Sequence, residues 1–146
     1  MERVLKGKAL VPGIAEGIAV VSNQPISFWG GVDPLTGDII DRRHERYGIN
    51  ITGKIFVFPV GKGSSTSSAV LMEGIRNGTA PAGIVMKKID PILALGAIVS
   101  EEMYQQSLPI ILLDETDFDA IYEADYLKIQ LDAVILLSRD TTNGSI

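Results

Sequence analysis

Apolar residues in this chain fall into short runs separated by glycine, proline and polar residues. Several of these runs alternate with small or polar side chains, and others are continuous and rich in β-branched or aromatic residues. Both patterns are typical of strands with one or two buried faces. They predict strands at residues 4–11, 14–21, 26–29, 55–58, 82–86, 109–113, 127–131 and 133–137.

Helical spacing is confined to three shorter stretches. Apolar residues three apart predict a helix over residues 69–78, ending at an Asn-Gly pair. An Asp-Pro pair, typical of an N-cap followed by a first-turn proline, predicts a second helix over 90–95. Gly96 is expected to stop that helix, with 97–99 extended and one further helical turn after it. A third short helix is expected over 117–122.

The order of these elements predicts a mixed α/β fold. Strands precede, interleave with and follow short helices, which favours a layered arrangement of sheet and helix. Crossovers over residues 55–86 and 84–113 predict parallel pairing, and the Pro-Gly turn at 12–13 predicts an antiparallel hairpin. We expect one domain over residues 1–137 and a flexible polar tail over 138–146.

Composition narrows the possible functions. The chain has 146 residues, 46% of them hydrophobic, which suits one globular domain. The net charge of −5 argues against a nucleic-acid surface. No apolar run approaches the ~20 residues of a membrane-spanning helix, and no signal-peptide core follows the N-terminus, so a cytoplasmic location without membrane binding is expected. The chain has no cysteine and one histidine, His44, which excludes thiolate and multi-histidine metal sites.

The most distinctive polar segment is Gly61-Lys-Gly-Ser-Ser-Thr-Ser-Ser68, between the strand at 55–58 and the helix at 69–78. It matches neither the nucleoside-triphosphate loop nor the dinucleotide fingerprint. Glycines, a lysine and the positive end of a helix nevertheless favour a small anionic ligand, and a serine held there could act as a base. The simpler alternative is a polar N-cap on a surface helix, with glycines only for the turn.

This loop resembles the Gly-x-Gly-Ser-Ser loop in the swivel domain of the aconitase superfamily. Residues 27–41, which begin Ser-Phe-Trp-Gly-Gly-Val-Asp-Pro, are similar to the small subunit of aconitase X in particular. So are Ala-Pro-Ala-Gly-Ile-Val at 80–85 and Gly-Ala-Ile-Val at 96–99. The resemblance covers about residues 3–135.

The resemblance implies a swivelling three-layer β/β/α domain that forms a heterodimer with a large subunit. That subunit would hold an iron–sulfur cluster, which fits the absence of cysteine here. By position, Ser64 corresponds to the serine that acts as the catalytic base of aconitases. The residues implied in substrate binding are Lys62, Gly63, Ser65 and Thr66. Thr66 replaces the arginine that clamps a substrate carboxylate in aconitase proper, which argues against citrate or isopropylmalate.

Within the family, the resemblance is greatest to archaeal phosphomevalonate dehydratases. It implies dehydration of (R)-5-phosphomevalonate to trans-anhydromevalonate 5-phosphate, a step toward isoprenoids, with Ser64 as proton acceptor. Another aconitase X hydro-lyase, such as a hydroxyproline dehydratase, is the alternative enzyme; those are usually fused to the large part. A phosphohistidine carrier domain is the non-enzyme alternative, but it needs a histidine after the strand near residue 97, and none is there.

Other polar and aromatic residues have simpler interpretations. Trp29 is expected to form a wall of the cleft or of the partner interface, and Asp33 to cap its own turn. Lys62 is a candidate for a phosphate contact. The charged run at 41–47 is expected to be solvated or to dock against the large subunit, and His44 within it is given no catalytic role.

Overall fold

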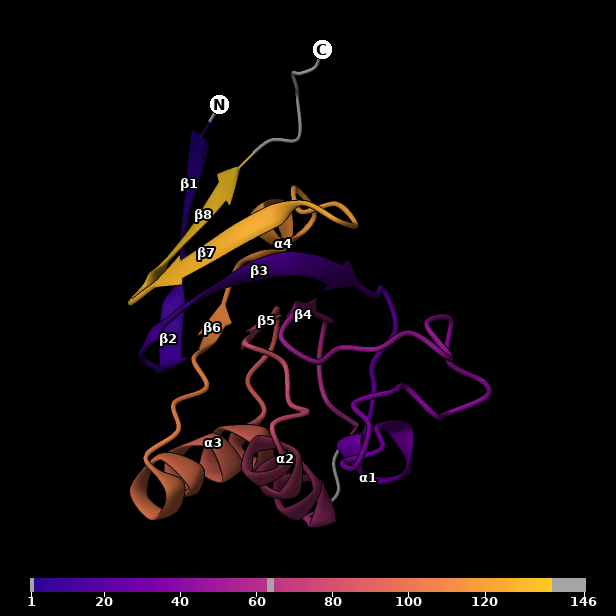
Figure 1. The fold of residues 1–146 in the computed structure, drawn as a ribbon. Coiled ribbons are helices and arrows are strands. Elements are labelled where there is room, and N and C mark those ends of the chain that lie inside the picture. Colours follow the sequence, from indigo (N-terminus) through magenta and orange to yellow (C-terminus); the bar gives the residue numbers. More distant parts are fainter. Residues whose placement is uncertain (1, 63–64, 138–146) are drawn as a thin grey trace.

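The structure is a computed structural model, and it describes residues 2–62 and 65–137. Within them, eight strands form a mixed sheet in the order β1-β8-β7-β3-β4-β5-β6-β2 (Figure 1). The strands are β1 (Glu2–Lys6), β2 (Lys8–Val11), β3 (Ile14–Val21), β4 (Ile55–Val57), β5 (Gly83–Met86), β6 (Ile110–Leu112), β7 (Tyr126–Gln130) and β8 (Ala133–Leu137). The helices are α1 (Phe28–Gly31), α2 (Thr66–Asn77), α3 (Pro91–Tyr104) and α4 (Glu115–Phe118).

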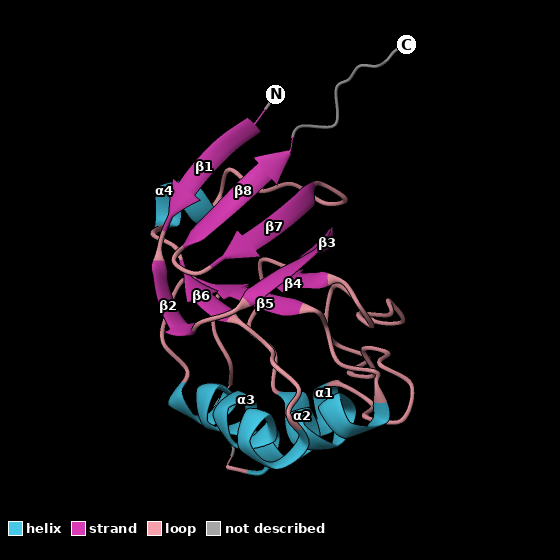
Figure 2. Cartoon of the chain, turned by 60° about the vertical axis from the view of Figure 1, so that its left-hand side comes forward, coloured by secondary structure: helices cyan, strands magenta, loops and turns pink. Residues whose placement is uncertain are grey.

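The strands divide into two stacked layers that share β3. The first part of β3 pairs antiparallel with β7, whereas residues 19–21 pair parallel with β4. At the opposite side, β1 pairs with β8 in one layer and β2 pairs with β6 in the other layer. Only Gly7 separates β1 from β2. A side chain at Gly7 would meet the carbonyl oxygen of Leu112, so glycine lets the chain bend from one layer into the other. Figure 2 shows α2 and α3 beneath the β4–β6 layer.

Alternation along the central strands builds two separate cores. Ile55 and Val57 of β4 face the space between the two sheet layers, where Phe118 and Leu127 also pack. Phe56, which lies between these two residues, and Phe58, just after β4, face the helices instead. That second core contains Phe28, Phe56, Phe58, Leu71, Ile84, Met86 and Leu93. The layers are therefore sheet, sheet and helix, which confirms the predicted β/β/α fold class.

Helix α3 is longer than predicted. It runs for 14 residues through Gly96, so the expected stop at Gly96 and the extended piece at 97–99 are wrong. A Cβ at Gly96 would lie 3.0 Å from the carbonyl oxygen of Ser68 in α2. Gly96 therefore allows α2 and α3 to pack closely, and its missing side chain serves helix packing rather than helix termination. Helix α2, by contrast, ends as predicted, with Gly78 in the left-handed conformation.

The strand predicted at residues 26–29 is also wrong. Ile26 forms only an isolated parallel bridge with Gly61, and the short helix α1 follows it. Gly30 has a φ of 78°, a left-handed conformation that kinks α1. The predicted tail at 138–146 lies outside the described residues. Among the described helices, none has the length and apolar character needed to cross a membrane.

Candidate functional site

The start of the hydroxyl loop is fixed between α1 and α3. Gly61 bridges to Ile26, and the N–H of Lys62 donates to the Ile26 carbonyl oxygen over 3.1 Å. On its other side, Gly61 contacts the carboxylate of Asp90 so closely that a Cβ would collide with it. Glycine at position 61 is thus required by packing, and it sets where the loop leaves the sheet.

Ser64 and Gly63 lie outside the described residues, so the catalytic role of Ser64 stays a prediction. The structure brings the other three predicted site residues to the beginning of α2. Ser65 is the N-cap, Thr66 is the first helical residue, and Lys62 precedes them; all three are exposed. Ser65 makes no side-chain capping hydrogen bond. The loop is therefore at the N-terminus of a helix, as the sequence indicated.

The last two hydroxyls of the run have structural contacts. Ser67 is buried, its Oγ lies 3.2 Å from the Oγ of Ser27, and it accepts a hydrogen bond from the N–H of Trp29 over 3.3 Å. The Oγ of Ser68 donates to the Ser65 carbonyl oxygen. Ser67 thus ties α1 to α2, a role that sequence reasoning missed because its partners lie about 40 residues earlier.

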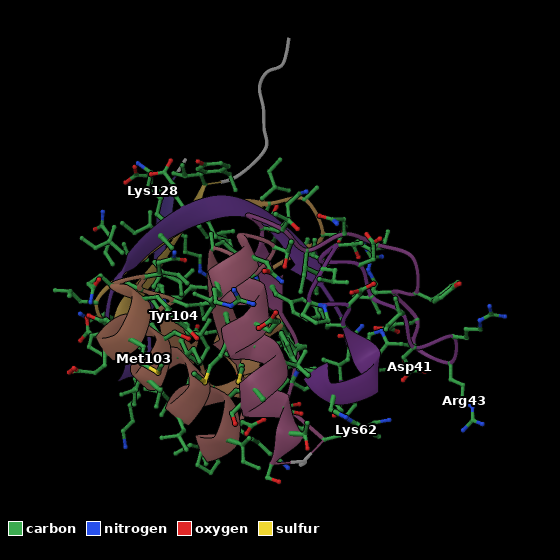
Figure 3. The ribbon with its side chains drawn as sticks, turned by 60° about the horizontal axis from the view of Figure 1, so that its bottom comes forward. Asp41, Arg43, Lys62, Met103, Tyr104 and Lys128 are labelled. Carbon is green, nitrogen blue, oxygen red and sulfur yellow. The ribbon has the colours of Figure 1, made fainter. Side chains whose placement is uncertain are left out.

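A hollow of about 360 Å³ opens beside Lys62. Lys62 lines it together with two other segments of the chain, and the described residues that line it are Gln24, Pro25, Asp41, Arg43, His44 and Lys62. We call it the Arg43 hollow. Asp41, Arg43 and Lys62 lie together near α1, on a different side from Met103 and Tyr104 of α3 (Figure 3). Sequence reasoning did not join Arg43 to Lys62, because no local pattern signals their proximity.

His44 is buried, and both of its ring nitrogens are engaged within the chain. Nδ1 accepts a hydrogen bond from the N–H of Arg46 over 3.0 Å, and Nε2 lies 3.3 Å from the Oγ of Ser22. We infer the neutral tautomer with its proton on Nε2, because Nδ1 is an acceptor. His44 therefore holds the 41–47 loop in place, consistent with its having been given no catalytic role.

Glu45, which is itself exposed, extends this network. Its carboxylate accepts a hydrogen bond from the N–H of Asn23 over 2.6 Å and one from the Oγ of Ser22 over 2.9 Å. The Asn23 N–H is the main reason that the pKa of Glu45 lies below its usual value; desolvation opposes the shift, and the Ser22 hydroxyl and the positive charge of Arg46 reinforce it. Glu45 is thus a structural anion.

The remaining polar residues follow their simpler interpretations in part. The carboxylate of Asp33 accepts from the N–H of Leu35 over 2.9 Å and so caps its turn, as expected. Trp29 is 59% exposed beside α2. Arg46 is ion-paired with Glu123 over 2.6 Å, so the charged run is not uniformly solvated.

The described residues contain no group of three His, Cys, Asp or Glu side chains placed to hold a metal ion. The whole chain also lacks cysteine. Its own side chains therefore do not fit the ligation of an iron–sulfur cluster.

Comparison with known proteins agrees with this architecture. The family model of the aconitase X swivel domain matches residues 4–137, and the chain belongs to that family. It is 38% identical over 126 residues to the phosphomevalonate dehydratase small subunit of Methanosarcina acetivorans, covering 86% of this chain and 83% of that one. It is 49% identical over 96 residues to the small subunit of that name from Pyrococcus abyssi, covering 66% and 74%.

A second group of relatives is much longer than this chain. The chain is 43% identical over 133 residues to the cis-3-hydroxy-L-proline dehydratase of Pseudomonas aeruginosa, which covers 91% of this chain but only 23% of that enzyme. Among solved structures, aconitase X of Thermococcus kodakaraensis in its holo-form superposes with a TM-score of 0.83 at 36% identity, covering 93% of this chain and 99% of the other. These matches confirm the resemblance to aconitase X and the fold.

Proposed function

We propose that this chain is the small subunit of a phosphomevalonate dehydratase. The observation that carries the proposal is the pairing of a hydroxyl loop at the start of α2 with the cation-bearing Arg43 hollow beside it. A phosphorylated carboxylate substrate needs a base near the carbon next to its carboxylate and cations near its phosphate. The similarity to small subunits of that name, over most of their length, supports the same reaction.

In the proposed reaction, water is removed from (R)-5-phosphomevalonate to give trans-anhydromevalonate 5-phosphate. The deprotonated hydroxyl of Ser64 accepts the C2 proton, the C2–H electron pair forms the C2=C3 double bond, and the C3 hydroxyl leaves and becomes water on protonation. Helix α2 contributes its positive N-terminal end, which favours the anionic form of a serine at the loop. Ser65 and Thr66, at the first turn of α2, are proposed to help hold the substrate.

A large subunit is proposed as the partner that completes the site. The name "small subunit" on the archaeal relatives implies a second chain. Because this chain supplies no cysteine, an iron–sulfur cluster of the aconitase type, which acts as a Lewis acid toward a leaving hydroxyl, would have to be held by that partner. The exposed indole of Trp29, beside the loop, is proposed to contact the large subunit or to wall the cleft.

The competing substrate is cis-3-hydroxy-L-proline, because dehydratases named for it are relatives at comparable identity. That molecule carries a carboxylate and an ammonium group but no phosphate. The presence of two cations at the Arg43 hollow favours the phosphorylated substrate.

Co-expression with the proposed large subunit tests the proposal. We expect the purified complex to convert phosphomevalonate to its anhydro product, followed by mass spectrometry, and neither chain alone to do so. Activity of the complex on cis-3-hydroxy-L-proline but not on phosphomevalonate would assign the alternative substrate. Full activity of this chain alone would reject the two-subunit arrangement.

A further inference from the structure

We propose that the Arg43 hollow is a phosphate-binding site and that Arg43 is the residue that selects a phosphorylated substrate. The assignment of that phosphate to the dehydratase substrate rests on the proposed function; the affinity of the hollow for a phosphate group does not. Arg43, Lys62 and Gln24 all line the hollow. The proposed ligands are the guanidinium of Arg43, the ammonium of Lys62 and the side-chain amide of Gln24.

Arg43 and Lys62 are cations without an ion-pair partner among residues 2–62 and 65–137. Four ion pairs are formed there, by Lys6, Arg46, Arg76 and Lys87, and neither hollow cation takes part. The contrast with Arg46 is informative, because it lies three residues after Arg43 and is neutralised by Glu123. Arg43 therefore keeps the planar fork of donors that matches phosphate oxygens, and Lys62 adds a second positive charge.

Gln24 and Asp41 each use one side-chain oxygen to accept a backbone hydrogen bond within the chain. The Oε1 of Gln24 accepts from the N–H of Glu45 over 2.9 Å, and no described residue accepts a hydrogen bond from the Gln24 NH₂ group. Asp41 is the one carboxylate that lines the hollow, and its Oδ1 accepts from the backbone N–H of Arg43 over 3.0 Å. Two cations against one carboxylate leave an excess of one positive charge. A hollow of this composition favours an anion with several acceptor oxygens.

The hollow is also within reach of the proposed base. Ser64 is two positions after Lys62 in the sequence, so the chain allows their Cα atoms to be at most about 7 Å apart. In phosphomevalonate, the reacting C2 carbon and the phosphorus are separated by a chain of similar length. A substrate anchored by its phosphate at Arg43 and Lys62 can thus place C2 near Ser64, and an unphosphorylated substrate loses this anchor.

The test compares Arg43→Gln with Arg42→Gln in the purified two-subunit complex. Arg42 is also exposed in the same charged run but does not line the hollow, so it controls for a general loss of positive charge. For Arg43→Gln we expect the KM for phosphomevalonate to rise on the order of 10- to 100-fold, the effect of losing a charge-assisted hydrogen bond, with kcat little changed. Arg42→Gln should behave like the parent. Lys62→Gln should also raise KM.

Three outcomes would overturn the inference. Equal KM values for parent and Arg43→Gln would remove Arg43 from the site, and equal losses in both arginine variants would show a diffuse charge effect. Dissociation of the Arg43→Gln complex in size-exclusion chromatography would make Arg43 a docking residue. Should the complex fail to act on phosphomevalonate, the proposed function falls, and titration of the isotope-labelled full chain with inorganic phosphate decides the site. Shifts of the Arg43 and Lys62 amide signals, weakened by Arg43→Gln, would support it; no shift would reject it.

Discussion

The N-termini of α2 and α3 lie close together but are capped in different ways. At α3, Pro91 has no N–H, Ile92 and Leu93 donate to the Oδ1 of Asp90, and Ala94 donates to the Asp90 carbonyl oxygen. Every donor of that first turn is used within the chain. At α2, the N-cap Ser65 makes no side-chain capping bond, and the preceding segment carries a lysine and hydroxyls.

The difference separates a helix start that is capped by a side chain from one whose N-cap residue makes no side-chain capping hydrogen bond. Unpaired N–H groups at a helix start are met by a cap, by water or by a bound anion. Asp90 supplies the α3 cap at the cost of burying a carboxylate, which is 8% exposed. The same carboxylate presses against Gly61 and so positions the loop that precedes α2. The residue that caps α3 therefore also positions the segment that leads into α2.

The largest expected effect comes from Ser64, which precedes α2 in the sequence. Ser64→Ala should lower the turnover of the two-subunit complex by about 10²- to 10⁴-fold, because it removes the proposed base while leaving the subunits assembled. Steady-state kinetics and size-exclusion chromatography measure the two properties. Ser68→Ala, in the same hydroxyl run, is the matched control and should keep near-parent turnover. Near-normal turnover of Ser64→Ala would exclude Ser64 as the base.

The contact between the two helix starts gives the second largest effect. Gly61→Ala should lower the free energy of unfolding by about 1–3 kcal/mol, since its Cβ would collide with the Asp90 carboxylate. Urea denaturation measures this cost. In an Asp90→Ala background the collision disappears, and the same substitution should cost clearly less. An unchanged cost in that background would show that the contact does not constrain the loop.

The third prediction concerns the N-cap of α3. Asp90→Ala should lower the free energy of unfolding by about 1 kcal/mol, because two amide groups at the start of α3 lose their acceptor. Asp90→Asn should retain most of the stability, as asparagine caps comparably. Ser65→Ala, at the N-cap of α2, should change the free energy of unfolding by at most about a few tenths of a kcal/mol, because Ser65 makes no side-chain capping hydrogen bond. Equal losses for Asp90→Ala and Ser65→Ala would erase the distinction between the two helix starts.

The smallest effect concerns Glu45, another carboxylate used within the chain. Its pKa is lower in the folded protein than the ordinary 4.5, so ionised Glu45 stabilises the fold. This contribution is fully present above the unfolded pKa and is lost as pH falls through the lower folded-state pKa. Glu45→Gln should therefore be less stable than the parent at pH 7, by a few tenths of a kcal/mol for so exposed a group, and the difference should vanish in acid. A pH-independent difference would argue against this linkage.

Much of the fold could be predicted from local patterns. Alternation and β-branched runs located β3 and β8 at the boundaries that the structure has, and Gly78 was correctly expected to end α2. The antiparallel hairpin predicted at residues 12–13 is wrong, because β2 pairs with β6 and β3 pairs with β7 and β4 instead. Two other failures have one physical origin. Gly96 was expected to end a helix, but its small size is needed for contact with α2, and residues 26–29 were expected to form a strand although their partners lie at Gly61 and Ser67. Long-range contacts outweighed local propensity in both cases.

The candidate site, too, could be predicted from the sequence only in part. The position of Lys62, Ser65 and Thr66 at a helix start followed from a local sequence of glycines and hydroxyls. The Arg43 hollow did not, because it depends on the bridge between Ile26 and Gly61 that brings three separate segments together. The hydrogen-bond network of His44, Ser22 and Glu45 that holds the 41–47 loop likewise has no signature in the sequence alone.

The bend at Gly7 has a consequence for the order in which the chain can fold. Because β1 and β2 are one stretch of chain, the N-terminal residues belong to both sheet layers, and β1 pairs with β8 at the far end of the sequence. During synthesis on the ribosome, the β4–β6 layer and its helices can form early, but β1 must wait for residues 133–137 to emerge. Such sequence-distant pairing slows folding. Until then, the edges that β8 will complete stay exposed to other nascent chains.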